Sequence, residues 1–313
     1  MSGESSATVD ERRLLLHGQA WGSVGVLAFS LSLPTTQVAV RELGPTFATA
    51  GRAVAAAVLA AGYLTWRRAR LPDRSLLPSL LLVAAGVVVG FPLFTALALQ
   101  HTDSAHGAVI VGLLPAATAV AGVLRTGERP SPAFWAACAA GAVAVAVFAL
   151  VQGRGLPTTD DALTVAAVVC AAVGYAEGAR LAPVLGADQV ICWALLLSTP
   201  VLLPVLLMDV AIQPPAAGAS GWACFAYTAA VSMFLGFFAW YRGLALGGVA
   251  KVSQVQLAQP LLTVAESVLL FGQELDPTVL PAALAVLACV AAAQRTRVQR
   301  QRAARYPEAP FPG

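Results

Sequence analysis

The amino-acid sequence predicts an all-α integral membrane protein in which ten transmembrane helices form two inverted five-helix repeats. Three observations predict this fold class. Charged residues make up 11% of the 313-residue chain and hydrophobic residues 58%, whereas soluble domains are roughly one quarter charged. Asp, Glu, Lys and Arg are absent from residues 75–102, 130–153, 189–208 and 210–241, and about 20 helical residues cross a hydrocarbon core of ~30 Å. The third observation is an internal repeat.

Ten apolar segments are expected to span the membrane, and all should be helical because backbone groups in lipid must bond within their own segment. In chain order they lie near residues 17–38, 45–66, 76–99, 106–124, 132–151, 162–182, 189–208, 219–240, 249–271 and 278–294. The first follows the basic pair Arg12-Arg13, the second ends at the arginine cluster of residues 67–74, and the fourth ends at Arg125. The third, fifth, seventh and eighth occupy the charge-free stretches.

In the second half, the sixth span ends close to Arg180, the ninth follows Lys251, and the tenth ends at the basic tail of residues 295–313. With the N-terminus in the cytoplasm, nearly all of the 19 basic residues fall on the cytoplasmic side, as the positive-inside rule requires. Only Arg41 and Arg154 fall outside, and Arg52 lies within the second span. We therefore expect residues 1–13 and 295–313 to be cytoplasmic and the protein to lie in the inner (plasma) membrane of a bacterium. The basic tail is expected to lie near anionic lipid.

The internal repeat has a spacing of 145 residues. This shift places Pro115 on Pro260, Gly127 on Gly272 and Pro132 on Pro277, residue types that each have a backbone consequence. The two copies cover residues 14–151 and 160–294 and contain five spans each. Because five is odd, the second copy must enter the membrane from the opposite side. Inverted repeats of this kind recur in secondary transporters, with the substrate held between the copies near mid-depth.

Several segments resemble the EamA-type family of the drug/metabolite transporter superfamily. They are "WGSVGVLAFSLSLP", "FATAGRAVAAA", "FPLFTALALQ", "GLLPAATAVAGVLRTGERPS", "GFFAWYRGLAL" and "QPLLTVAESVLLFGQELD". The resemblance covers about residues 14–293 and implies a ten-helix carrier, often an exporter of amino acids, metabolites or drugs. The two copies differ at one point, since the first reads Gly127-Glu128 and the second Gly272-Gln273-Glu274. The role of the acidic residue in the first copy therefore cannot be assigned to Glu274.

Four polar residues of the ninth span are expected on one helix face, because at 100° per residue they fall within an arc of roughly 80°. They are Gln256, Gln259, Thr263 and Glu266. This face is expected either to line the substrate pathway or to hydrogen-bond to neighbouring helices. Glu266 is also a candidate for proton coupling, because an ionisable group at membrane depth is expensive and usually functional. The alternative is a structural, hydrogen-bonded glutamate.

Further candidates come from the other spans. Glu177 and Arg180, three residues apart, can form a local ion pair that is either structural, part of a gate or a site of proton coupling. Arg52 either extends to the interface or faces the pathway as an anchor for an anion or a carboxylate. The family has an arginine here too, which favours the pathway. Trp240 and Tyr241 are expected either in an interfacial aromatic belt or in a closure on the cytoplasmic side.

Pro115 and Pro260 are expected to interrupt the hydrogen bonding of the fourth and ninth helices. Each proline either makes a fixed kink that shapes packing or provides a compliant point along the pathway.

The leading functional hypothesis is a secondary active exporter of small metabolites that works by alternating access. A passive channel or facilitator is the alternative, and a membrane-embedded enzyme is a weaker one. The sequence has no HExxH, no Asp-rich lipid-phosphate motif and no GxxxxGK[ST], so neither catalysis nor direct ATP drive is expected. No cofactor, metal site or nucleic-acid partner is expected. The expected partners are a small-molecule substrate, the lipid bilayer and protons as coupling ion.

Overall fold

The predicted all-α membrane architecture is confirmed by a computed structural model, which describes residues 2–126, 129–152, 157–247, 252–295 and 298–299. The first repeat contains α1 (Ser2–Ser30), α2 (Ser32–Leu43), η1 (Phe47–Gly51), α3 (Arg52–Trp66), η2 (Arg74–Leu76), α4 (Leu77–Val83), η3 (Ala84–Gly90), α5 (Phe91–Ala98), α6 (Ser104–Val111), α7 (Leu114–Thr126) and α8 (Pro132–Gln152). The second contains α9 (Thr159–Leu185), α10 (Ala187–Ile212), α11 (Ala219–Ala226), η4 (Tyr227–Leu235), α12 (Gly236–Gly247), η5 (Ser253–Ala258), α14 (Gln259–Leu269) and α15 (Val279–Arg295). Two short strands, β1 (Arg129–Pro130) and β2 (Val298–Gln299), pair antiparallel.

Within the described residues, eight helical stretches are long and apolar enough to cross a membrane. They correspond to the first eight predicted spans. A shorter apolar helix, Val279–Ala292, lies at the position of the tenth. The ninth is represented by η5 and α14. The count of ten spans stays a prediction. The Gly127-Glu128 pair and tail residues 300–313 lie outside the described residues.

Several spans are built from more than one helical segment. α1 and α2 meet at Leu31, and α6 and α7 are separated by Gly112 and Leu113. The third and eighth spans each contain a stretch of π-helix, η3 and η4. Residues 84–90 of η3 fall on 229–235 of η4 under the 145-residue shift, so the two repeats carry the same irregularity at the same place.

Pro115 and Pro260 each lie directly after an interruption of a helical span, and whether they act as kinks in transport stays a prediction. Pro115 is the second residue of α7, which starts after the break at Gly112 and Leu113. Pro260 is the second residue of α14, which follows the 3-10 segment η5. Proline is tolerated in the first turn of a helix, where its missing N–H has no partner to lose. The interruption therefore precedes each proline, and the two interruptions lie close together, with a Cβ on Gly112 falling 3.4 Å from the Pro260 ring.

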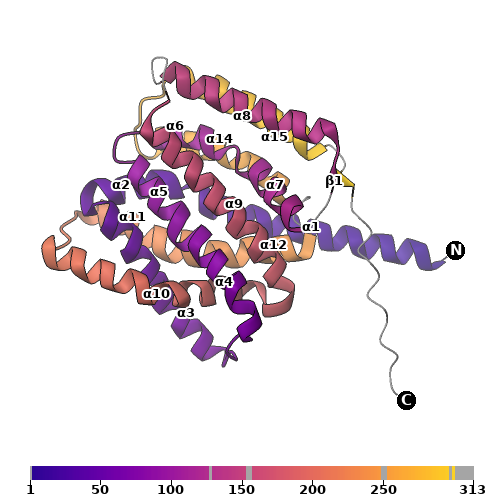
Figure 1. Ribbon diagram of the computed structural model, residues 1–313, viewed down its shortest axis with the longest axis horizontal. Coiled ribbons are helices and arrows are strands. Elements are labelled where there is room, and N and C mark those ends of the chain that lie inside the picture. The colour runs from indigo at the N-terminus through magenta and orange to yellow at the C-terminus, as the bar shows by residue number, and fades with distance from the viewer. Residues whose placement is uncertain (1, 127–128, 153–156, 248–251, 296–297, 300–313) are drawn as a thin grey trace.

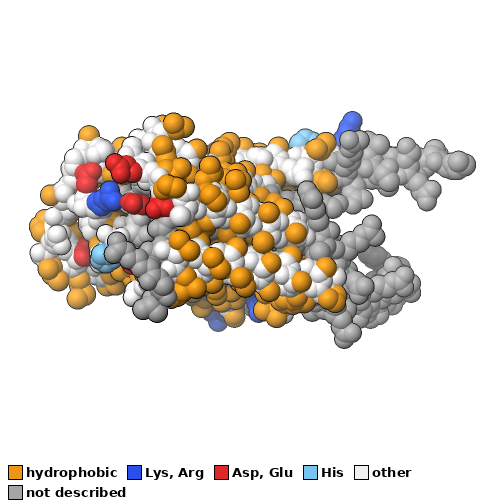
Figure 2. All heavy atoms as spheres, turned by 90° about the horizontal axis from the view of Figure 1, so that it is seen from above, with side chains coloured by type: hydrophobic (Ala, Val, Ile, Leu, Met, Phe, Trp, Pro, Cys, Tyr) orange, Lys and Arg blue, Asp and Glu red, His pale blue; other side chains and the backbone are white. Residues whose placement is uncertain are grey.

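Charged side chains separate to the two ends of the molecule. Contacts gather Glu42, Asp103, Asp160 and Asp161 at what we call the acidic end. Arg67, Arg125, Arg180 and Arg242 lie at the opposite end, which we call the arginine end. Figure 2 shows acidic side chains gathered at one end and hydrophobic side chains over the middle of the face it displays. This distribution is the one a membrane-spanning protein requires.

The helices of the two repeats pack across each other in matched pairs. α1 packs against α12, and its counterpart α9 packs against α4, η3 and α5. α3 packs against α10, and α8 lies beside α15 along one side of the molecule (Figure 1). α7 packs against α9 as α14 packs against α1. Each of these contacts therefore has a counterpart under exchange of the repeats.

A glycine seam brings α1 and α12 together most closely. A Cβ on Gly18 would fall 2.5 Å from the Gly247 nitrogen, and one on Gly243 would fall 2.7 Å from the Gly22 nitrogen. Any side chain larger than hydrogen would push the two backbones apart. In lipid the hydrophobic effect does not drive helices together. Small residues at a helix contact let the backbones approach closely, so van der Waals packing holds the helices together instead.

Candidate functional site

A small enclosed space lies where the two repeats meet, and we call it the central cavity. Its volume is about 30 Å³. The first repeat contributes residues of α1, α2, α3, η3 and α5, and the second contributes residues of α9, η4, α12 and α14. The polar side chains that line it are Ser32, Thr36, Arg52, Thr95, Ser232 and Gln259. Ser32 and Ser232 hydrogen-bond across the interface between the repeats, with 2.6 Å between their oxygens.

The π-helical stretches η3 and η4 place side chains in the cavity wall. Val87 of η3 and Ser232 of η4 both line the cavity and are equivalent under the 145-residue shift. So are Pro92 and Phe237, one turn further along each helix. Short π segments within helices occur frequently at functional sites, because they disturb the regular hydrogen-bond ladder. This symmetric pair marks the cavity as a site built from both repeats.

Among the described residues, Arg52 is the only basic residue that lines the cavity, and no acidic side chain of this part of the chain pairs with it. Its side chain is 4% exposed. One guanidinium nitrogen donates to Thr36 Oγ1 at 3.1 Å, while Nε is buried without a partner. None of the described residues that line the cavity is Asp or Glu. A charge in the middle of a membrane protein costs on the order of 2.5–3.5 kcal/mol by insertion scales. An unpaired buried arginine therefore destabilises the protein, and a residue kept at such a cost usually serves a function.

Three of the four residues predicted on the polar face of the ninth span are buried, Glu266 is half-buried, and the four meet different neighbours. Gln256 and Gln259 are 1% and 6% exposed. The Gln256 amide donates to Gln259 Oε1 at 3.4 Å, and its own oxygen has no partner. Only Gln259 of the four predicted residues lines the central cavity.

Thr263 and Glu266 instead bind the joint in the first span. Thr263 Oγ1 donates to the Ser30 carbonyl oxygen at 2.7 Å. The Ser30 hydroxyl donates to Glu266 Oε1 at 2.8 Å, while Glu266 Oε2 is buried without a partner. Ser30 is the last residue of α1, just before the break at Leu31. A change in the charge of Glu266 would therefore act on the joint between α1 and α2.

Trp240 and Tyr241 lie beneath the cavity, on the side of the arginine end. Both are 0% exposed, so the interfacial-belt alternative does not hold for them. The Trp240 ring lies 6.2 Å from Phe29 and 5.5 Å from Tyr175, two aromatic residues of the cavity wall. The Tyr241 hydroxyl donates to the Gly174 carbonyl oxygen at 3.3 Å. These rings form an aromatic layer that closes the cavity toward the arginine end.

Further toward that end lies a four-residue polar group, the Glu177 cluster. The Glu177 carboxylate is 0% exposed and accepts from both Arg125 and Arg180, each with a shortest distance of 2.6 Å. Arg180 also donates to Ser79 Oγ at 2.6 Å. The predicted pairing of Glu177 with Arg180 is present, and Arg125 is a partner that local spacing did not indicate. Because Arg125 and Ser79 belong to the first repeat, the cluster ties the two repeats together.

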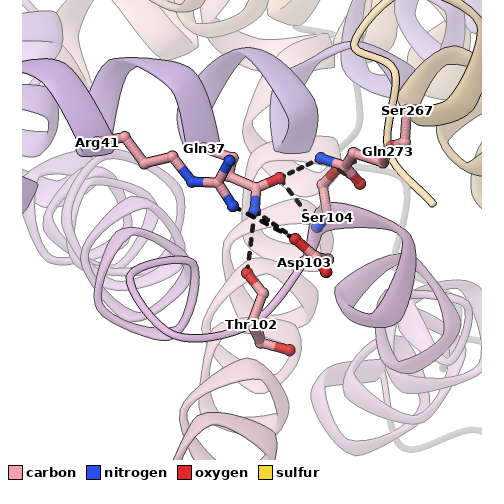
Figure 3. Close-up of polar contacts among 7 residues, drawn as sticks. All are labelled: Gln37, Arg41, Thr102, Asp103, Ser104, Ser267 and Gln273. Carbon is pink, nitrogen blue, oxygen red and sulfur yellow. Dashed lines mark hydrogen bonds and ion pairs between the residues drawn. The ribbon is translucent and has the colours of Figure 1, made fainter.

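The acidic end is closed by a second polar group, the Gln37 cluster, drawn in Figure 3. The Gln37 amide nitrogen donates to the Thr102 carbonyl oxygen at 3.2 Å and to Asp103 Oδ1 at 3.0 Å. Its oxygen accepts from the Ser104 backbone N–H at 3.2 Å and from the Gln273 amide. Gln37 is 1% exposed, and its side-chain amide is fully hydrogen-bonded.

Two further members of the Gln37 cluster complete it. Ser104 Oγ lies 2.8 Å from Ser267 Oγ and donates to Gln273 Oε1 at 3.1 Å. Arg41 adds an exposed contact of 3.4 Å to Asp103, which contributes little because both side chains face solvent. Ser267 and Gln273 belong to the second repeat, so this cluster also joins the two repeats.

A wider cavity of about 700 Å³ lies at the arginine end. Trp21, Tyr63, Asp188 and Arg242 contribute to its wall, and the Tyr63 hydroxyl donates to Asp188 at 2.7 Å. Phe238 lines this cavity, whereas the adjacent residue on α12, Phe237, lines the central one. Neighbouring residues of α12 therefore face the two different spaces.

Sequence reasoning missed Arg125, Gln37, Gln273 and Ser30. The long separations along the chain, such as 52 residues between Arg125 and Glu177, hide these contacts from any local pattern. A usable signal for Gln37 was the position of its amide near the end of an apolar span. Among the described residues, no group of three or more His, Cys, Asp or Glu side chains is arranged to hold a metal ion.

Comparison with known proteins gives three findings. The sequence profile of the EamA-like transporter family matches residues 16–150 and again residues 159–293. The chain is 49% identical over 274 residues to a Bacillus subtilis (strain 168) protein named "Uncharacterized transporter YdeK", which covers 88% of this chain and 96% of that protein. A protein of known crystal structure superimposes with a TM-score of 0.63 at 18% identity, over 89% of this chain and 98% of its own. This last similarity concerns the fold alone.

Proposed function

From the premise that this chain belongs to the EamA-like transporter family and is a multi-pass membrane transporter, we propose that it is a secondary active exporter. Its substrates would be small metabolites such as amino acids or drug-like amphipathic compounds, moved by alternating access. The observation that carries the proposal is the central cavity between the repeats, with an inter-repeat polar cluster toward each end. Inverted-repeat carriers hold their substrate in this position and expose it alternately to the two sides.

The matched packing of the two repeats supports a two-fold relation between them. The opposite directions of α1 and α9 support an inverted arrangement, because α1 runs away from Trp21 at the arginine end and α9 runs toward Arg180 at that end. If the copies are related by a two-fold axis in the membrane plane, each contact between repeats must recur with the roles exchanged. The pairing of α1 with α12 recurs as the pairing of α9 with the third span. The helices α3 and α10 are counterparts in the two repeats, and so are α8 and α15. Exchange of the repeats therefore leaves each of these two contacts unchanged. The proposed orientation places the arginine end in the cytoplasm of a bacterium, with both termini on that side.

The two clusters suit a carrier better than a channel. Each joins the first repeat to the second by several hydrogen bonds, so each can open only when the repeats move relative to one another. The wider cavity at the arginine end would receive the substrate from the cytoplasm. The aromatic layer containing Trp240 would have to move before the substrate reached the central cavity.

Glu266 is the proposed coupling residue. Its free carboxylate oxygen and its hydrogen bond to Ser30 place an ionisable group at the joint of the first span. Binding and release of a proton there would alternately strengthen and weaken the hold on that joint. In this scheme proton entry drives substrate export.

The test has two parts. Leu71 and Ala216, both exposed, occupy equivalent loops of the two repeats under the 145-residue shift. Single cysteines at these positions should react with a membrane-impermeant maleimide from opposite sides of the membrane, and reaction from the same side would rule out the inverted arrangement.

The second part addresses transport. Medium from cells that overexpress the chain is compared with medium from control cells to find the exported solutes, and uptake of those solutes into inside-out vesicles is then measured. A proton-coupled exporter accumulates the solute against its gradient until an uncoupler is added. A channel only equilibrates it.

A further inference from the structure

We propose that the central cavity binds an amphipathic organic monoanion, with Arg52 holding its single carboxylate. This inference rests on the proposed function, since it takes the central cavity as the transport site. It narrows the substrate to a charge class and excludes amino acids and organic cations as preferred ligands.

The first step of the argument is charge. Arg52 is 4% exposed, and its only hydrogen bond in the structure goes to the neutral hydroxyl of Thr36. Nε is buried and has no partner. A guanidinium presents its donors in a planar fork that matches the two oxygens of a carboxylate. The unused donors therefore point to an anion, which would reach them when the repeats move apart, because the cavity of about 30 Å³ in this closed form is about the size of one water molecule.

The second step is the number of charges. Arg52 is the single basic residue among the described residues of the cavity wall, and none of those residues is acidic. One positive charge balances one negative charge, so a dianion would bring a second charge without a partner. The ammonium group of an amino acid or of a cationic drug would likewise find no carboxylate. Burying an unpaired charge is costly.

The third step is the apolar part of the ligand. Phe29, Phe91, Tyr175 and Phe237 line the cavity together with Leu33 and Met233. Aromatic rings in a cavity wall favour flat apolar groups of similar size. Gln259 and Ser232, on the wall supplied by the second repeat, can donate or accept one further hydrogen bond. A carboxylate attached to an aromatic or branched apolar body matches this lining.

The experiment uses five ligands that share a phenyl ring and differ in charge. They are 3-phenylpropionate, its neutral amide 3-phenylpropionamide, phenylalanine, phenethylamine and phenylsuccinate. Binding to the full-length purified chain in lipid nanodiscs is followed by calorimetry and by tryptophan fluorescence, because Trp240 contacts the rings of the cavity wall. We expect 3-phenylpropionate to bind at least ten times more tightly than each of the other four. Tighter binding of phenylalanine, phenethylamine or phenylsuccinate would overturn the proposal, and so would no binding by any ligand.

Variants test the role of Arg52 itself. Arg52→Gln should weaken 3-phenylpropionate at least tenfold and leave 3-phenylpropionamide within about twofold of the wild type. Arg52→Lys should restore part of the preference for the acid because it keeps the charge. Arg70→Gln removes an exposed arginine from a loop and should change nothing. If Arg52→Gln does not fold, the ligand preference of the wild-type chain still decides the question.

Counterflow in proteoliposomes separates this inference from the proposed function. A carrier that exchanges phenethylamine or phenylalanine but not 3-phenylpropionate would retain the proposed function and refute the monoanion. A chain that binds 3-phenylpropionate through Arg52 but exchanges no ligand would retain the binding site and refute the carrier.

Discussion

Replacing Glu177 by glutamine should open the arginine end of the protein. In the structure the buried carboxylate accepts two hydrogen bonds from Arg125, at 2.6 and 3.0 Å, and two from Arg180, at 2.6 and 3.2 Å. A glutamine side chain keeps one oxygen, but its NH₂ group would face guanidinium donors. Breaking a buried ion pair costs about 3–5 kcal/mol when the remaining charge stays buried.

The cost here should be lower, because the side chains of Arg125 and Arg180 are 48% and 57% exposed and can recover hydration. We therefore expect a loss of about 2–3 kcal/mol. If this loss falls on the form that is closed at the arginine end, the ratio of open to closed molecules rises roughly 30- to 150-fold.

The assay is maleimide labelling of a cysteine in the central cavity. Ala171 lines that cavity and is buried, and its replacement by cysteine adds one sulfur atom. The five native cysteines are first replaced so that only this thiol reacts. The reagent is membrane-impermeant and is applied from the arginine end, and the labelling rate should rise by the same factor as the open population.

Glu274→Gln is the matched control, because Glu274 is an exposed residue in a loop and the substitution removes the same charge. Its labelling rate should equal that of the starting protein. The reasoning is refuted if the Glu177→Gln rate lies within twofold of this control while the protein remains folded.

Three further predictions follow from other contacts. Glu266→Gln should abolish uphill transport driven by a pH gradient but preserve counterflow at equal pH, since glutamine can still accept the Ser30 hydrogen bond; vesicle uptake under both conditions measures this. Gly178→Ala should destabilise the protein by about 1–3 kcal/mol, because a methyl group there overlaps the Tyr241 ring. Gly62→Ala, with open space around it, should not lower the melting temperature in nanodiscs. Gln37→Leu should remove four hydrogen bonds and increase labelling of the cavity cysteine from the acidic end, and an unchanged rate would refute a closing role for this side chain.

The span positions could be predicted from hydropathy because burial in lipid acts on every residue of a segment. The second and fifth spans, expected at 45–66 and 132–151, agree closely with Phe47–Trp66 and Pro132–Val151. The breaks within spans could not be predicted. The π stretch η3 packs against α9, a helix of the other repeat, and hydropathy does not say which helix lies opposite a span.

The polar face of the ninth span shows the same limit within the candidate site. Helical periodicity indicated correctly that Gln259 and Thr263 face protein, because both are buried. Periodicity cannot say which helix lies opposite. Gln259 lies in the cavity wall, whereas Thr263, one helical turn further on, binds Ser30. Only the tertiary arrangement distinguishes their two environments.

The exact form of the interruption at each proline could not be predicted for a related reason. Sequence shows that Pro115 and Pro260 lack an N–H, but not whether a helix begins just before them. The unpaired donors of Arg52 likewise became visible only when the surrounding residues were in place.

The exchange of helices between the repeats also constrains how the protein is made. The first span is synthesised about 200 residues before α12. The glycines of α1 pack against the backbone of α12, so this contact forms late. A nascent chain that has reached residue 151 still lacks the partners of α1, η3 and α8. We therefore expect the first repeat, expressed alone, to be degraded by membrane quality control, and the two repeats, supplied as separate chains, to assemble and protect each other.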